Sequence, residues 1–183
     1  MTVKGRGLTV LAFAGYGVSA QRFFPAMTAM QPSALAAEYA FTFEVEIGEA
    51  IDAGDVGYGR RRLVAITGGT LQGPGISGTI LPGGADSMLI RRDGMVEIDV
   101  RSAVRMDDGS NVYVENRGIR VGPNDEAERI RRGETVGPGE IYFRMVLRFE
   151  TASETYRWLT RAIFIGQVRR RAGGLTIAVY RVP

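Results

Sequence analysis

Residues 88–117 read MLIRRDGMVEIDVRSAVRMDDGSNVYVENR, and this stretch decides the fold class. Apolar and polar side chains alternate from Val96 to Met106, which is the period of a strand with one buried face. Asp93-Gly94 and Asp108-Gly109 flank that run, and Asp-Gly pairs are typical of the turns that join antiparallel strands. The stretch therefore predicts three consecutive antiparallel strands.

The same alternation continues outward in both directions. Tyr39–Gly48 and Ile141–Glu150 each predict a half-buried strand, and further strand-like runs are Arg61–Thr67, Trp158–Ile165 and Leu175–Val182. About nine or ten strands in all are typical of a barrel or a sandwich. We favour an all-β, mainly antiparallel closed barrel, because closure removes the unpaired strand edges that invite aggregation.

One short helix is predicted between residues 124 and 133. Asn124 can cap its N-terminus and Gly133 can end it. Acidic residues come first and arginines last, an order that suits the helix dipole. The apolar side of this segment is narrow, so we expect the helix on the surface of the barrel.

Residues 1–37 differ in composition from the rest, and we expect an N-terminal extension followed by a barrel domain at residues 38–183. Three interpretations of the extension stay open, and the first is a loosely packed segment that adds a strand or covers an edge. The apolar run Leu8–Val18 resembles a secretory signal, although two glycines interrupt it. Alternatively, the extension contacts a partner or forms a homodimer through its large apolar side chains, which are Phe23, Phe24, Met27 and Met30. We favour a cytoplasmic location over a secreted one.

The composition of the 183-residue chain excludes several chemistries. The chain contains no Cys and no His, which excludes a thiolate nucleophile, a Cys-ligated zinc and a histidine base. We expect neither a metal nor a cofactor. A net charge of +3, from 23 basic and 20 acidic residues, is too small to predict binding to nucleic acid. No run approaches the roughly 18 apolar residues of a membrane span, so we expect a soluble protein without a membrane partner.

A glycine-rich stretch precedes the three strands: Gly68–Pro74 reads GGTLQGP, and Leu81–Asp86 reads LPGGAD. Together with four further stretches it resembles the domain-of-unknown-function 3237 family, also called uncharacterised protein family 0311; these stretches are Gly59–Ile66, Tyr142–Arg144, Phe149–Thr151 and Tyr156–Leu159. The resemblance covers Tyr39 to Val182 in order. It implies a calycin-like antiparallel barrel, a fold often built around a small-molecule cavity.

Two positions depart from the family pattern. Ser87 stands where the family usually has Trp, and Thr160 stands where it usually has Asn. If these positions line a pocket, the pocket is wider and differently polar here. The glycines either let a ligand approach the backbone or form the bulges and corners that barrel closure needs, and we favour the second interpretation.

Candidate site residues come from the family stretch and from the strand Ile141–Glu150. Asp86 either caps a turn or points into the mouth of the barrel. The polar face of the strand points to solvent in an ordinary barrel and inward in a barrel that holds a ligand. Our candidate catalytic residues are Asp86, Glu150, Tyr142 and Arg144. Candidate ligand contacts are Arg101, Trp158, Ser87 and Thr160. Alternatively, Trp158 is a residue of the hydrophobic core.

These residues support three functions. The first is a cofactor-independent isomerase, cyclase or lyase that acts on a small, partly apolar molecule. A buried carboxylate with a raised pKa would be the base, and Tyr and Arg would stabilise an oxyanion. The second function is ligand binding in the same cavity without chemistry. The third is a structural or interaction module whose extension forms the contact surface.

Overall fold

The computed structural model describes residues 35–123, 125, 129, 132, 134, 137 and 139–183. The chain divides into two units, residues 1–34 and 35–183, and the second unit contains all the strands described below. The predictions for residues 1–34 lie outside the described residues, as does most of the helix predicted between residues 124 and 133. In the described part of the chain, no helix has both the length and the apolar character needed to cross a membrane.

Nine strands and one short 3-10 helix follow one another along the second unit. They are β1 (Glu38–Asp55), β2 (Gly59–Gly73), β3 (Ile76–Ile80), β4 (Gly84–Arg91), β5 (Val96–Met106), β6 (Asn111–Val121), β7 (Tyr142–Glu150), η1 (Arg157–Arg161), β8 (Ile163–Arg171) and β9 (Gly174–Val182). All pairings between neighbouring strands are antiparallel.

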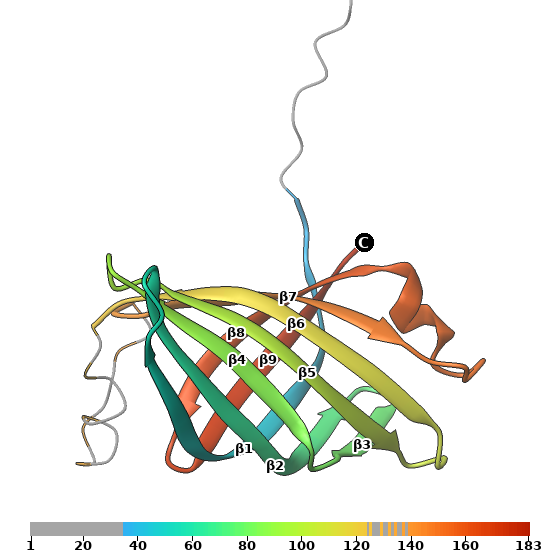
Figure 1. Cartoon of the computed structure of the whole chain (residues 1–183). Helices are drawn as coiled ribbons and strands as arrows, with labels where there is room; N and C mark the ends of the chain where they lie inside the picture. The colour runs from blue at the N-terminus through green and yellow to red at the C-terminus, as the bar shows by residue number, and fades with distance from the viewer. Residues whose placement is uncertain are drawn as a thin grey trace, which may run out of the picture. The chain divides into compact units, whose positions relative to one another are not determined.

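The strands close into a barrel (Figure 1). Neighbouring strands pair in the order β1-β9-β8-β7-β6-β5, and β1 also pairs with β2, which completes the ring. Between β2 and β5, the two short strands β3 and β4 share one position, because β4 pairs with the first half of β2 and β3 with its second half. The nine strands therefore occupy eight positions, and the predicted closed antiparallel barrel is confirmed.

The three strands predicted from residues 88–117 are β4, β5 and β6. At the first turn the Gly94 amide donates to the Arg91 carbonyl, and at the second the Gly109 amide donates to the Met106 carbonyl. The single strand predicted over Trp158–Ile165 is wrong. Trp158 lies in η1, and β8 begins only at Ile163.

The two ends of the barrel differ. The hairpin end is the end at which the β1–β2, β4–β5 and β8–β9 turns lie, and the helix end is the opposite one, next to η1. Aromatic rings fill the helix end: the centroid of Phe164 lies 5.2 Å from that of Phe149 and 5.7 Å from that of Trp158. Phe41 and Leu159 are buried in the same cluster. A solid core therefore occupies this half of the barrel.

The glycine-rich stretch forms part of the barrel wall, in β2. Glu46 pairs with Gly68 and Ile47 pairs with Ile66, so Thr67 is an extra residue in a bulge. Just beyond it, Gly69 has a φ of +131°, and a Cβ there would collide with the carbonyl oxygen of Glu44. Here the glycine lets β1 and β2 approach one another.

We predict that Gly69→Ala lowers the free energy of unfolding by about 2–4 kcal/mol, because the added carbon meets backbone and the left-handed conformation disfavours a side chain. Gly75→Ala is the matched control. Gly75 also has a positive φ, +68°, but open space surrounds its Cβ direction, so we expect a loss of about 1 kcal/mol. Urea denaturation of both variants measures the difference, and equal losses would contradict the close approach at Gly69.

Candidate functional site

The half of the lumen nearer the hairpin end contains a cavity of about 440 Å³. This volume lies within the range of small-molecule sites. Most of the lining is aliphatic or aromatic, with Phe43, Ile98 and Phe143 among the larger side chains. The polar side chains of the lining are Arg62, Asp86, Ser102, Asn116, Arg120 and Arg170.

Asp86 and Asn116 lie in one row across the barrel wall. Asp86 on β4 pairs with Val100 on β5, and Val100 pairs with Asn116 on β6. All three side chains line the cavity. Two strand spacings separate the outer members of the row, so their Cα atoms lie about 10 Å apart. A ligand group that rests over Val100 can contact the carboxylate on one side and the amide on the other.

The carboxylate of Asp86 is held by the backbone of the neighbouring strand. The Asp99 amide donates to Oδ1 of Asp86 at 3.2 Å, between the paired residues Asp86–Val100 and Leu89–Glu97. Burial raises the pKa of Asp86 from 3.8 to about 6, although this hydrogen bond lowers it. The negative charge of Asp99 raises the pKa further, and the positive charge of Arg170 lowers it.

Asn116 contributes a buried polar atom without a partner. Its side chain is 5% exposed, and Oδ1 has no hydrogen-bond partner among the residues that the structure describes. An unsatisfied buried polar atom costs the fold about 1–3 kcal/mol, and such atoms are rare in native proteins. A bound molecule would satisfy it.

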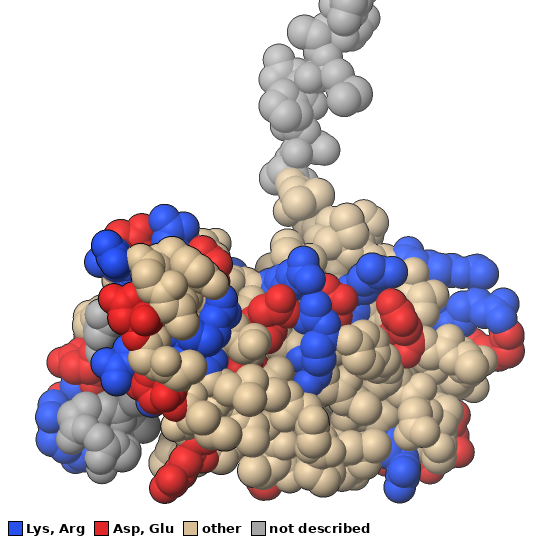
Figure 2. Space-filling model, in the orientation of Figure 1, with Lys and Arg blue, Asp and Glu red and all other residues tan. Residues whose placement is uncertain are grey.

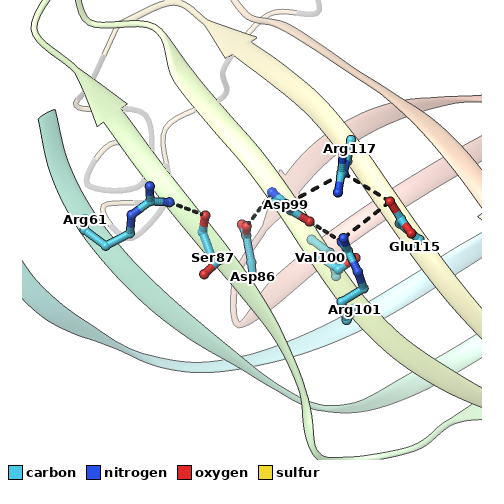
Figure 3. Close-up of polar contacts among 8 residues, drawn as sticks. All are labelled: Arg61, Asp86, Ser87, Asp99, Val100, Arg101, Glu115 and Arg117. Atoms are coloured by element: carbon cyan, nitrogen blue, oxygen red, sulfur yellow. Dashed lines mark hydrogen bonds and ion pairs between the residues drawn. The ribbon is translucent and has the colours of Figure 1, made fainter. Parts of the chain in front are cut away.

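Directly behind Asp86, on the outer face of the barrel, four charged side chains form a network (Figure 3). Arg101 pairs with Asp99 and, at 3.3 Å, with Glu115. Arg117 pairs with Glu115 at 3.1 Å and with Asp99 at 3.7 Å. The predicted ligand contact Arg101 therefore lies outside the lumen. On the face shown in Figure 2, basic and acidic side chains also lie next to one another in a band, and uncharged residues cover a broad area below it.

The polar face of β7 points outward. Tyr142 is 52% exposed, and Arg144 lies over the Tyr142 ring, 5.2 Å from its centroid. The side chain of Glu150 is 58% exposed and pairs with Arg148. The opposite face of β7 consists of large apolar side chains that fill the lumen, and strand alternation then directs the polar face to solvent. Within the described chain, Asp86 is the one candidate catalytic residue that lines the cavity.

The remaining candidate ligand contacts also lie away from the cavity. Trp158 packs on the aromatic cluster of the helix end. Thr160 is exposed on η1 and donates to the Arg157 carbonyl. Ser87 is exposed on β4, where its carbonyl accepts a hydrogen bond from Arg61 (Figure 3). The departures from the family pattern at Ser87 and Thr160 therefore do not alter this cavity.

Sequence reasoning missed five polar lining residues: Arg62, Ser102, Asn116, Arg120 and Arg170. A signal was present on β6, where Asn116 and Arg120 occupy the same alternation phase as the buried Val112 and Val114. A polar residue in the alternation phase of buried apolar residues points into the lumen.

Comparisons with known proteins agree with the fold and give no activity for the site. A family model described as "Protein of unknown function (DUF3237)" matches residues 35–182. A UPF0311 protein of Rhodopseudomonas palustris is 44% identical over 148 residues, which cover 81% of this chain and 97% of that protein.

Solved structures share the barrel. A conserved protein of unknown function from R. palustris gives a TM-score of 0.77 at 43% identity, covering 84% of this chain and 100% of that one. A beta-barrel like protein from Acinetobacter baumannii gives 0.72 at 29% identity, covering 84% and 99%. A structure described as an enzyme from Penicillium herquei gives 0.64 at 20% identity, covering 84% and 98%, a likeness of fold.

The raised pKa of Asp86 predicts a stability that depends on pH. The folded state holds the Asp86 proton up to about pH 6 and the unfolded state only up to about 3.8, so this contribution to stability is full at low pH and lost as the pH rises through about 6. Asp86→Asn removes this dependence on pH. We therefore expect the free energy of unfolding of the variant, relative to that of the native chain, to rise by about 2 kcal/mol from pH 4.5 to pH 8.

Urea denaturation at the two pH values measures this gain. Ser87→Ala, at the neighbouring outward position, is the control and should change stability equally at both. A variant Asp86→Asn that gains nothing at pH 8 would contradict a carboxylate disfavoured by burial.

Proposed function

The chain belongs to the DUF3237 family of proteins of unknown function, and we propose that its lumen binds a small, partly apolar molecule with which Asp86 exchanges a proton. The observation that carries this proposal is the row of Asp86, Val100 and Asn116. It places a buried carboxylate and an unsatisfied amide oxygen on either side of one apolar contact.

The lining describes the molecule. Apolar side chains surround most of the cavity, so the body of the ligand is apolar. Asp86 and Asn116 offer hydrogen bonds at about the middle of the lumen. A molecule that satisfies both carries an oxygen or nitrogen group there, next to an apolar skeleton.

Proton transfer suits the environment of Asp86. With a pKa of about 6, the carboxylate is ionised at neutral pH and is a stronger base than an exposed Asp. It takes a proton from a carbon or oxygen acid of the ligand. The unsatisfied Oδ1 of Asn116 accepts a hydrogen bond from an O–H or N–H group of the ligand and so fixes its orientation beside Asp86. The proton then returns to a different atom of the same molecule, which gives an isomerisation or a cyclisation with no change of oxidation state.

The same fold is compatible with catalysis, since one structure that shares it is described as an enzyme. That likeness supplies no substrate. The choice between an enzyme and a carrier therefore depends on Asp86 itself.

We predict that Asp86→Asn retains ligand binding and lowers turnover at least about 100-fold, because Asn cannot accept a proton. The bound compound is first extracted from the purified protein and identified by mass spectrometry. A time course with this compound then measures product. In the native chain the rate should rise with pH through about 6, as the Asp86 carboxylate loses its proton.

Glu150→Gln is the matched control, because Glu150 is a carboxylate on the outer face and should leave turnover unchanged. Full turnover in Asp86→Asn would refute the role of Asp86. A compound that binds and never changes would make the barrel a binding protein.

A further inference from the structure

Three arginines line the cavity near its hairpin end. Arg62 lies three residues after the start of β2, and Arg120 and Arg170 are each the last residue but one of β6 and β8. Their strands lie on different sides of the barrel. We call these three residues the arginine ring.

Arg62 has a side-chain nitrogen that makes no hydrogen bond to any described residue. Its Nε is shielded from solvent and has no hydrogen-bond partner in the part of the chain that the structure describes. The carboxylate of Asp52 lies 3.7 Å away, too far for a hydrogen bond, and it already accepts one from Arg60 at 2.7 Å. A guanidinium in this state retains capacity for an oxygen ligand.

The other members of the arginine ring add positive charge to the same space. Arg120 is 6% exposed and donates to the Pro123 carbonyl at 2.6 Å. Arg170 acts electrostatically on Asp86 from β8, which lies on the opposite side of the barrel from β4. The described lining contains one carboxylate, that of Asp86, and Arg120 and Arg170 have further interactions of their own. The unsatisfied Nε of Arg62 favours an anion, and a guanidinium fork matches a carboxylate in shape.

Arg62 and Asp86 lie at different depths. Arg62 pairs with Met88, two residues nearer the hairpin end than Asp86. At about 3.4 Å per residue, the two levels are about 7 Å apart. The lining residues paired with them are apolar: Met88 is the partner of Arg62 and Val64 is the partner of Asp86.

We propose that the ligand of this barrel is an amphipathic organic acid, whose carboxylate binds Arg62 of the arginine ring while its apolar body extends down the lumen to Asp86. This inference rests on the proposed function, because it takes the cavity as the ligand site.

The test compares two probes of the same size and shape, 3-phenylpropionate and 3-phenylpropan-1-ol, by isothermal titration calorimetry with the full chain at pH 7.5. The carboxylate should bind about tenfold more tightly than the alcohol, because the charge-assisted hydrogen bonds to arginine are lost in the alcohol. Raising the salt concentration should weaken binding of the carboxylate and leave the alcohol unchanged.

Arg62→Gln should bring the affinity for the carboxylate close to that for the alcohol. Arg60→Gln is the matched control, since Arg60 pairs with the same Asp52 but has a side chain that is 61% exposed and does not line the cavity, and it should preserve the preference. An equal loss in both variants would overturn the inference, because overall charge would then explain the result.

The outcomes also separate this inference from the proposed function. If the native chain binds both probes equally, the arginine ring selects no anion and the inference fails, while the cavity remains a ligand site. If neither probe binds at millimolar concentration, the inference fails together with the proposed ligand site. The proton exchange is judged by turnover in Asp86→Asn, which these affinities do not measure.

Discussion

The pairing of β1 with β2 is the constraint on which the rest of the structure depends. β1 pairs with β9 along its first half and with β2 from Thr42 to Asp55, so one strand closes the ring. Closure separates an inner face from an outer face on every strand, and alternation then determines which side chains share the lumen. The bulge at Thr67 and the close approach at Gly69 let this pairing bend.

Inside that closed wall, polar groups are rare and concentrated in one half. The helix end is filled by the rings of Phe41, Phe149 and Phe164, whereas the hairpin end holds Asp86 and Asn116. Both polar residues reduce stability, one through a charge disfavoured by burial and the other through an unsatisfied oxygen. Such local conflicts with an apolar core are expected at functional sites, where binding rather than folding satisfies the group.

The fold was largely predictable from the sequence because its signals are local. Alternation and Asp-Gly turns identify β4, β5 and β6, and each depends on residues next to one another in the chain. Asp86 was found through a shared family stretch. The sequence does not determine the outward direction of Tyr142, Arg144 and Glu150, because alternation identifies two faces but does not say which is inside when a lumen can hold polar groups.

The arginines of the lumen were harder to predict for a related reason. Arg62 and Arg170 each belong to a run of three arginines. Because all three residues are equally polar, the sequence pattern does not indicate which of them points into the lumen. The row of Asp86 and Asn116 depends on strand register across β5, and a single sequence contains no direct record of register.

The shared position of β3 and β4 gives the wall a seam. Everywhere else around the ring one strand bridges its two neighbours, whereas here Leu81–Gly83 links two short strands, with the Leu81 amide donating to the Ala103 carbonyl of β5 and the Gly83 amide to the Ile66 carbonyl of β2. Shorter ladders open locally at lower free energy than long ones, so we expect amide protons of β3 and β4 to exchange with solvent ahead of those on β6. Asp86 belongs to β4, so a local opening of this short strand would expose its carboxylate to water through the wall, with both ends of the barrel intact.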